Sequence, residues 1–507
     1  MIRARHLFKS SIIVILLFGL GKITGLLRIR LVSTAFGAGA AYDAYTAANQ
    51  LPEVFFTIIA GGSLAAAFIP VYSDYLNNKS TKESARLANT ILTLVIAILG
   101  FISLVGAVFA PWLTRHVLVP GFSPEMQSLT AEIMRVILLQ TTLFGISGVI
   151  SSILNTHQHF AVPAMASISL DLGYIMGLFL FAPRIGIVGL AWGTVLGALI
   201  QIFIQVPVLR HFHFRYWPVL AVKMRGVREI ILLMIPRIFT LGAIQIADLF
   251  IIRLASGMVV GSTSAYFYAY SLMQFPETLF ATAIALVVFP TMSELYNAGD
   301  IDGLRHIAGQ TLSIIWFLTI PAAVGMVLLG RPLIALLLQG GAFTASSADL
   351  VYVILVVFSV RIVTEATVEV VARLFYAQHN TWIPMLSYTG WLVVNVLIAY
   401  LLVEELGIVA LALASTVAFT LLAIVLFYLN SRSLGGLESR ALTISLVRGV
   451  LAATGMAIVI LLISQLIKSP IMLLVAGGAA GAATYFILSY LLGGKEIQHL
   501  VQLMRAR

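Results

Sequence analysis

The stretch GIVGLAWGTV at residues 186–195 returns in altered form as GIVALALAST at residues 407–416. Three further landmark pairs have the same separation of 221 residues: Pro111 and Pro332, Phe122 and Phe343, and Pro163 and Pro384. Upstream, the motif QLPE at residues 50–53 matches QFPE at residues 274–277 at a separation of 224 residues. Four matches at one offset are hard to obtain by chance. The chain is therefore predicted to contain an internal repeat.

The composition fits a protein that uses lipid as its solvent. Of 507 residues, 60% are hydrophobic and only 10% are charged, and the mean hydropathy is +1.04. A helix needs roughly 20 residues to cross a hydrocarbon core of about 30 Å, and longer charge-free runs recur, for example at 87–114 and 374–403. These runs lack the alternation of an outer-membrane barrel, so the chain is predicted to be an all-α integral membrane protein.

About 14 transmembrane helices are predicted, at residues 11–36, 41–75, 88–113, 127–153, 161–182, 186–209, 229–256, 262–294, 307–330, 348–377, 383–403, 407–430, 442–466 and 470–492. Each repeat contains six of them. Because six is even, the two six-helix repeats are expected to be parallel and to form two lobes. The predicted parts are an N-lobe at 1–220 with spans 1–6, a C-lobe at 221–437 with spans 7–12, and two extra helices with a cytoplasmic tail at 438–507.

The basic residues predict the orientation of the chain. An even number of spans puts both termini on one side, and seventeen of the thirty Lys and Arg residues fall in the tails and loops on that side, against four on the other. The positive-inside rule then predicts cytoplasmic termini. The net charge of +10 is dispersed over loops. This distribution indicates contact with anionic membrane lipids and argues against nucleic acid as a partner.

Several other classes are disfavoured by what the sequence lacks. With no cysteine, the chain has no disulfide, thiol nucleophile or thiolate metal site, which leaves the redox compartment undecided. The first forty residues resemble a signal peptide, but Lys22, Arg28 and Arg30 interrupt the segment before any cleavage site, so the first helix is expected to stay. No P-loop, nucleophile elbow, dinucleotide fingerprint or metal-ligand spacing appears. We expect a transporter with no catalytic residues, metal or cofactor.

Charged residues inside the predicted spans indicate a polar interior. Nine are basic, Arg253 in the seventh span among them, and six are acidic. A lipid-exposed charge at the centre of a span costs roughly 2.5–3.5 kcal/mol, so most of these side chains must face a watery cavity or one another. We therefore treat Arg253 as a candidate substrate-binding residue.

The first span carries Lys22, Arg28 and Arg30 with no acidic residue in the same helix. Arg30 is close enough to the outer end of the span to reach lipid headgroups, so a snorkelling role and a cavity role remain equally open for it. For Lys22 and Arg28, near mid-depth, a cavity role is favoured. An unpaired cationic cluster suits a phosphate or diphosphate, which arginine binds with its planar fork of donors.

The tenth span carries Arg361, Glu365, Glu369 and Arg373 at successive four-residue steps, which places all four on one helix face. Two interpretations remain open: a structural ladder that neutralises its own charges, or a proton or cation relay that faces the substrate cavity. A weaker candidate ion site combines Asp248 in span 7 with Asn395 in span 11, although nothing in the sequence shows that they meet.

A set of short motifs follows one order along nearly the whole chain: Gly25-Leu26-Leu27-Arg28, Phe36-Gly37-Ala38-Gly39, Tyr42-Asp43-Ala44, Ala67-Phe68-Ile69-Pro70, Gly121-Phe122, Ile153-Leu154-Asn155-Thr156, Gly340-Gly341-Ala342-Phe343-Thr344-Ala345 and Arg373-Leu374-Phe375-Tyr376-Ala377. Individually weak, together they resemble the lipid II flippase family (MurJ/MviN) of the multidrug/oligosaccharidyl-lipid/polysaccharide exporter superfamily. The plan of six, six and two spans also fits that family.

The resemblance implies a V-shaped, two-lobed transporter in the bacterial inner membrane. Its implied substrate is the undecaprenyl-diphosphate-linked precursor of peptidoglycan, moved by alternating access, with cell-wall synthesis proteins as further partners. Cavity cations would hold the diphosphate, and a groove lined by the last two helices would take the polyprenyl tail. The family's first-span basic pair falls on Lys22 and Arg28, and its outer-loop aspartate on Asp43. A coupling cation, Na⁺ or H⁺, or the membrane potential would supply the energy.

The chain also departs from the family pattern. Where relatives carry a basic residue in span 2 it has Phe56 or Thr57, Gly61 replaces a glutamate, and Ser271 replaces a basic residue in span 8. A flippase for another polyprenyl-linked glycan therefore stays open as an alternative. So does a drug or metabolite exporter of the same superfamily, although such exporters typically have twelve spans. A membrane-embedded glycan transferase would need a large catalytic loop, and a scaffold would not need so many intramembrane charges.

Overall fold

The computed structural model describes residues 2–60, 62–212, 214–494 and 496 of the chain. Within these residues all the regular secondary structure is helical, and thirteen helical segments are long and apolar enough to cross a membrane. The predicted fold class, an all-α integral membrane protein, is confirmed. The thirteen segments correspond to predicted spans 2–14. The first predicted span falls on α1 (Ile2–Phe36). The structure does not describe the side chains at the beginning of this helix.

The chain divides into two compact units, residues 1–263 and 264–507. We expected the N-lobe to end at residue 220. The helix α10 (Arg225–Ala255), which is the first span of the second sequence repeat, packs against α2 and α3 of the first unit. The compact unit therefore continues past the end of the repeat, because side-chain packing rather than sequence similarity decides which helices cluster.

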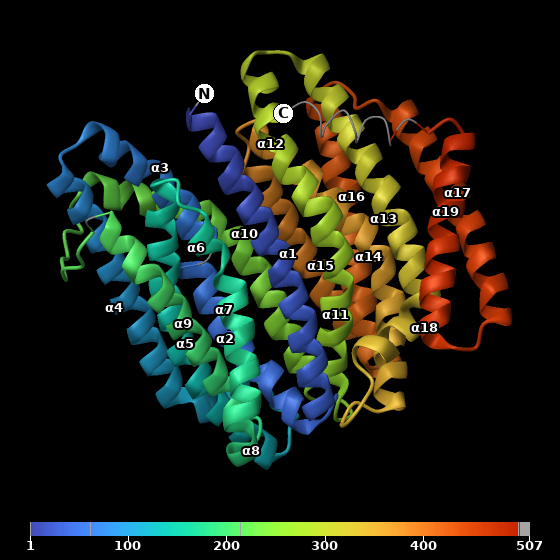
Figure 1. The fold of residues 1–507 in the computed structure, drawn as a ribbon, viewed down its shortest axis with the longest axis horizontal. Coiled ribbons are helices and arrows are strands. Elements are labelled where there is room, and N and C mark those ends of the chain that lie inside the picture. Colours follow the sequence, from blue (N-terminus) through green and yellow to red (C-terminus); the bar gives the residue numbers. More distant parts are fainter. Residues whose placement is uncertain (1, 61, 213, 495, 497–507) are drawn as a thin grey trace. The chain divides into compact units, whose positions relative to one another are not determined.

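The first unit (Figure 1, blue to green) contains α1 and α10 and the elements between them. These elements are α2 (Ala40–Ile59), α3 (Gly62–Asn78), α4 (Thr81–Leu113), η1 (Thr114–Leu118), α5 (Pro124–Thr156), α6 (Ala161–Ala164), α7 (Ala166–Met176), η2 (Gly177–Phe181), α8 (Ala182–Ile185) and α9 (Val188–His211). The helix α5 packs against α2, α4 and α9, and α9 packs against α7. The π-helical segments η1 and η2 each add a residue to a turn, a distortion often found near functional sites.

Local sequence signals explain where the long helices begin. The Ser80 side chain accepts the backbone N–H of Glu83, whose carboxylate accepts the Ser80 backbone N–H, so α4 starts with a capping box. Ser123 caps α5 in the same way and is followed by Pro124 at the first helical position, where a missing N–H costs nothing. These caps fix the first turns of two long membrane-spanning helices.

The glycines in the repeated stretch at residues 186–195 explain the close packing of α7 and α9. Gly189 and Gly193 lie one turn apart on α9 and face Gly177 at the end of α7. A Cβ on Gly193 would lie 2.7 Å from the Cα of Gly177, which is closer than real Cβ atoms approach. The glycines therefore let the two backbones touch, as small residues do at membrane helix interfaces.

The second unit (Figure 1, yellow-green to red) contains α11 from residue 264 onward, after two residues that belong to the first unit. Its elements are α11 (Ser262–Glu277), η3 (Thr278–Thr282), α12 (Ala283–Asn297), α13 (Ile301–Leu337), α14 (Ala345–Ala377), α15 (Trp382–Leu406), α16 (Ile408–Ser433), α17 (Ser439–Leu466), α18 (Pro470–Met472), η4 (Leu473–Gly477) and α19 (Gly478–Leu491). The helix α14 packs between α13 and α16, and α17 packs against both α13 and α19.

The local backbone of the two units supports the predicted repeat. Gly186 before α9 and Gly407 before α16 have φ of 59° and 55°, and they are 221 residues apart. Gln158 and His379 are the non-glycine residues with positive φ in the described chain, at 60° and 56°, and they have the same separation. Such residues are uncommon, so their recurrence at one offset is hard to attribute to composition.

Candidate functional site

In the first unit, the predicted cation Arg28 forms an ion pair with Asp171. Its Nε atom lies 2.9 Å from Oδ1 of Asp171, and the hydroxyl of Thr24 donates to Oδ2 of the same carboxylate at 2.7 Å. The Nε–H does not align as a hydrogen bond, so the contact is one of charge. The aspartate is buried, whereas the Arg28 side chain keeps 30% of its surface exposed.

Close packing of α1 against α7 brings these residues together. Gly21 on α1 faces α7 so closely that a Cβ there would lie 2.7 Å from the Ser167 hydroxyl. Three and seven residues later on α1, Thr24 and Arg28 reach the α7 face that carries Asp171 and Tyr174. The missing side chain therefore sets the distance at which the ion pair forms.

A tyrosine layer lies beneath the Arg28 guanidinium. Its Cζ atom lies 4.7 Å from the centre of the Tyr174 ring, the geometry of a cation–π contact. The hydroxyl of buried Tyr45 donates to that of Tyr174 at 2.8 Å, and Tyr42 stacks on Tyr45 with ring centres 5.9 Å apart. The guanidinium is thus fixed on one side by a ring and on one edge by a carboxylate.

The structure corrects the prediction of an unpaired cationic cluster. Arg28 has an acidic partner, which the sequence did not reveal because that partner lies on another helix. Lys22 is exposed and Arg30 half-buried. Among the described residues, no hydrogen bond engages the terminal Nη atoms of Arg28, and the contact recorded with Asp171 is made by Nε. These atoms therefore remain free to bind an anion.

Asp43, predicted to bind substrate, is buried at the start of α2. Only 1% of its surface is exposed, and its Oδ2 atom accepts the backbone N–H of Gly261 at 2.6 Å. Gly261 has φ of +95°, and a Cβ there would lie 2.6 Å from the Ala38 carbonyl oxygen. In this arrangement Asp43 ties the first turn of α2 to the turn after α10.

Arg253, also predicted to bind substrate, contacts backbone instead. Its Nη1 atom donates to the carbonyl oxygens of His116 and Val117 at 2.6 and 2.9 Å. These carbonyls belong to the last turn of η1, where backbone carbonyl groups have no hydrogen-bond donor within the helix. Arg253 therefore caps the π-helical turn after α4.

In the second unit, Arg361 is enclosed by partners on three helices. Its Nε donates to Glu365 at 2.7 Å, and Nη1 donates to the Ser415 hydroxyl of α16 at 2.6 Å. Its Cζ lies 4.1 Å from the centre of the Phe419 ring and 5.1 Å from that of Tyr270 on α11. With 5% of its surface exposed, Arg361 is held as a buried cation in an aromatic box.

The predicted ladder on α14 resolves into two local pairs. Arg361 pairs with Glu365, and Arg373 pairs with Glu369, in each case across one helical turn. Arg373 also donates to the Glu369 backbone carbonyl at 2.8 Å. The Glu369–Arg373 pair is more exposed than the other pair. Glu369 and Arg373 keep 27% and 20% of their side-chain surface exposed, whereas the values for Glu365 and Arg361 are 14% and 7%.

Two further polar residues belong to this cluster and were not predicted as site residues. Gln274 donates to Glu365 at 3.0 Å. Glu277, 3% exposed, accepts the hydroxyls of Thr278 and Thr282 and interacts electrostatically with Glu365 and Glu369. The repeated motif at 50–53 and 274–277 contains both residues, so it was the signal that could have identified them.

The weak ion site is not assembled within either unit. Asp248 lies half-buried on α10 of the first unit, and Asn395 lies buried on α15 of the second. The Oδ1 atom of Asn395 has no hydrogen-bond partner among the described residues. A shared ion site of these two residues stays a prediction.

Comparison with known proteins gives consistent similarities. The family model of the lipid II flippase MurJ matches residues 32–476. A probable lipid II flippase MurJ of Vibrio cholerae is 30% identical over 430 residues, covering 82% of this chain and 81% of that protein. A lipid II flippase MurJ of Burkholderia cenocepacia is 26% identical over 430 residues, covering 83% of each.

Solved structures share the fold. A lipid II flippase MurJ in an inward closed conformation matches with a TM-score of 0.82 at 22% identity, covering 95% of this chain and 98% of that one. An inward-facing multidrug resistance MATE transporter of the MOP superfamily matches with a TM-score of 0.69 at 17% identity, covering 85% and 99%.

The helical membrane fold and these similarities define a multi-pass membrane transporter rather than an enzyme. Within this class, the match of the family model over residues 32–476 identifies one family. The chain belongs to the lipid II flippase MurJ family.

Proposed function

We propose that this chain is a flippase that moves lipid II, the undecaprenyl-diphosphate-linked precursor of peptidoglycan, across the bacterial inner membrane. The family model and the relatives from Vibrio cholerae and Burkholderia cenocepacia carry this activity in their names. The observation that supports it from the chain itself is the placement of Arg28, a half-exposed guanidinium with free Nη atoms in a helix that also carries Lys22 and Arg30.

The chemistry of a diphosphate suits this site. Its oxygens accept two parallel hydrogen bonds from the Nη edge of a guanidinium, and such charge-assisted bonds are roughly twice as strong as neutral ones. Asp171 holds the Nε edge and Tyr174 the face, so the free edge is oriented before substrate arrives. Lys22 and Arg30 would add charge that a single arginine cannot supply. The proposed binding residues in the first unit are therefore Lys22, Arg28 and Arg30, with Asp43 and Arg253 holding the surrounding turns.

Alternating access would open the substrate site to one side of the membrane at a time, with both termini in the cytoplasm. The extra helices α17 and α19 pack beside α13, where the buried Tyr485 hydroxyl donates to the Phe317 carbonyl at 2.9 Å. The match to the MATE transporter covers nearly all of that protein but 85% of this chain. We assign α17 and α19 to the polyprenyl tail, which a small drug lacks.

The polar cluster of the second unit would couple transport to a cation, Na⁺ or H⁺, or to the membrane potential. Its two arginines and three glutamates leave one negative charge, at the buried Glu277 or at the more open Glu369. A surplus carboxylate in a protein interior attracts a proton or monovalent cation. Cell-wall synthesis proteins are the partners that would deliver or consume the substrate.

A flippase for another polyprenyl-linked glycan is the second candidate. At positions where the family resemblance predicts basic residues, Thr57 accepts a hydrogen bond from Gln245 at 2.8 Å, and the exposed Ser271 donates to the Phe267 carbonyl at 2.8 Å. Neither residue supplies a positive charge. Both candidates share the phosphate-linked polyprenyl tail, so they differ in the head group that the lipid carries.

The test is complementation in a bacterium depleted of its own lipid II flippase. An externally added hydrolase that cleaves lipid II only in the outer leaflet measures how much substrate has crossed. Cells that express this chain should regain cleavable lipid II. If the protein inserts and folds but lipid II stays in the inner leaflet, while another polyprenyl-linked glycan crosses, the second candidate replaces the first.

A further inference from the structure

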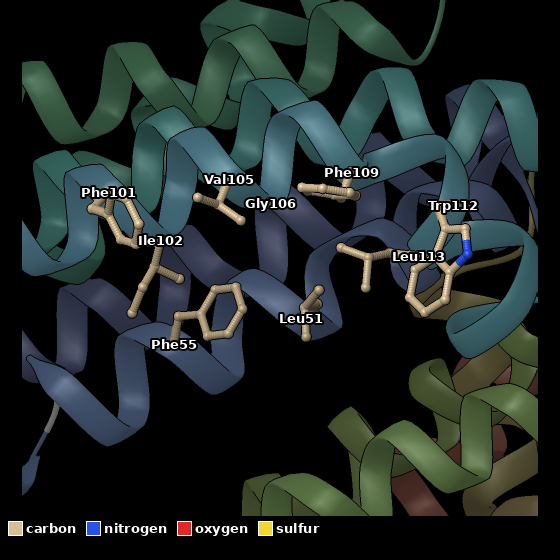
Figure 2. Close-up of a pocket in the computed structure, with 9 residues that line it drawn as sticks. All are labelled: Leu51, Phe55, Phe101, Ile102, Val105, Gly106, Phe109, Trp112 and Leu113. Atoms are coloured by element: carbon tan, nitrogen blue, oxygen red, sulfur yellow. The ribbon is translucent and has the colours of Figure 1, made fainter.

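An apolar groove runs between α2 and α4 of the first unit (Figure 2). Leu51 and Phe55 line it from α2, and Phe101, Val105 and Phe109 line it from α4. The groove has a volume of about 440 Å³, within the range of sites for small molecules. Apart from the indole of a tryptophan at one end, no lining side chain offers a hydrogen bond, so the site suits a hydrocarbon.

Beside the groove, α4 packs closely on α5. Gly106 of α4 is among the lining residues, and a Cβ there would lie 3.1 Å from a methyl carbon of Leu138 on α5. The α4 backbone therefore sits directly on a buried side chain. On the opposite side Phe101 is 68% exposed and Phe109 is 54% exposed, so the groove opens outward along its length. Figure 2 shows these two rings standing along the same side of α4.

The dimensions of the groove match one leaflet of a bilayer. From Phe101 to Leu113, at 1.5 Å per residue, the α4 wall is about 18 Å long. Half of a hydrocarbon core of about 30 Å is about 15 Å. The wall ends next to Arg115, the first charged residue after Arg86. The groove therefore runs along the half of α4 that ends at a membrane surface, as an acyl chain does.

The end of the groove carries the groups that meet a lipid headgroup. Trp112 lines the groove and stacks on exposed His116 with ring centres 5.4 Å apart. Arg115 is exposed and forms no ion pair or hydrogen bond with the residues that the structure describes. Arg253 fixes this turn through its two carbonyl contacts. A tryptophan beside a cation is typical of the level where hydrocarbon meets phosphate.

We propose that this groove binds one glycerophospholipid, with an acyl chain along α4 and its phosphate at Arg115. Ordinary boundary lipid covers the ridges of a membrane protein. Here a hollow three helical turns long ends at an exposed cation, so one lipid gains both apolar contact and a charged bond. The site lies in the first unit, whereas the helices assigned to the substrate tail belong to the second, and it does not depend on the proposed function.

The experiment measures phosphatidylglycerol binding to the purified full-length protein by native mass spectrometry. Val105→Trp should fill the groove and weaken the tightest lipid adduct at least tenfold. Val108→Trp is the matched control, because Val108 is 65% exposed on the same helix but does not line the groove. Arg115→Gln should weaken phosphatidylglycerol about tenfold, whereas Arg184→Gln, at another exposed arginine, should not.

Thermal melting of each variant in detergent separates loss of the lipid from loss of the fold, and Arg115→Gln changes only a surface charge. Equal lipid binding by the Val105 and Val108 variants overturns the proposal. Evidence for two other occupants would also contradict the proposal. A dimer that dissociates in the Val105→Trp variant would indicate that a second copy of the chain fills the groove. Competition between phosphatidylglycerol and a polyprenyl phosphate on the wild-type protein would indicate the substrate tail.

Discussion

The Nε atom of Arg28 lies 2.9 Å from Oδ1 of Asp171, although the two residues are on helices far apart in the sequence. The pair gives Arg28 a counterion before any substrate is present, and it leaves the Nη edge of the guanidinium open. Substrate anions would therefore bind to a cation that is already oriented but partly neutralised.

Arg28→Ala should weaken binding of a diphosphate lipid at least tenfold, equivalent to about 1.4 kcal/mol, because a charge-assisted bond is lost. Arg28→Lys should recover only part of it, since an ammonium lacks the planar fork. Binding is measured with lipid II on the purified protein, and Arg184→Ala is the exposed control. Wild-type affinity of a Lys22→Ala, Arg28→Ala double variant would remove both residues from the site.

Asp171→Asn should raise the affinity for the anion a few-fold. The asparagine keeps the shape of the side chain and an acceptor for the Thr24 hydroxyl, but it no longer competes with phosphate for the Arg28 charge. Thr24→Val, which removes the hydroxyl but leaves the ion pair, is the matched control and should change affinity less. A lower affinity of Asp171→Asn would show that the carboxylate acts by positioning Arg28.

The two pairs on α14 should respond differently to charge reversal. Exchanging Glu369→Arg with Arg373→Glu keeps an attraction across one turn at partly exposed positions, so the protein should fold. Exchanging Arg361→Glu with Glu365→Arg places a carboxylate against the Phe419 ring, which attracts cations, and should cost several kcal/mol. Melting temperatures in detergent measure both. If the folded Glu369/Arg373 exchange also transports normally, that pair is structural rather than a relay.

Gly193→Ala should destabilise the first unit by about 1–3 kcal/mol or more, because the added Cβ overlaps the backbone of Gly177. Gly100→Ala is the control on α4, where a Cβ meets nothing within 4 Å and the better helix propensity of alanine adds about 0.5–1 kcal/mol. Thermal melting compares the two. Similar melting temperatures would mean that α7 and α9 can separate without loss.

Both termini are predicted to be cytoplasmic. A reporter fused after Arg507 should be active if it requires the cytoplasm and inactive if it requires the periplasm. A reporter in the loop at residues 119–123, between two spans, should show the opposite pattern. The reverse pattern at both positions would invert the predicted orientation of every charged residue in the loops.

Length and apolar runs were enough to predict the membrane class and, to within several residues, the ends of most helices. A span of helix in lipid satisfies its own backbone hydrogen bonds, so its existence depends on its own residues. The pairing of Arg361 with Glu365 and of Arg373 with Glu369 was also readable, because residues four apart on a helix are neighbours whatever surrounds them.

Contacts between helices could not be read in this way. Asp171 as the partner of Arg28, the backbone bond of Asp43 to Gly261 and the capping role of Arg253 all join segments far apart in the chain. Each depends on which helices touch and at what rotation. These features follow from packing. For example, α1 approaches α7 at Gly21, and the sequence shows the glycine but not the helix that packs against it. The tertiary structure alone decided which charge on another helix neutralises Arg28.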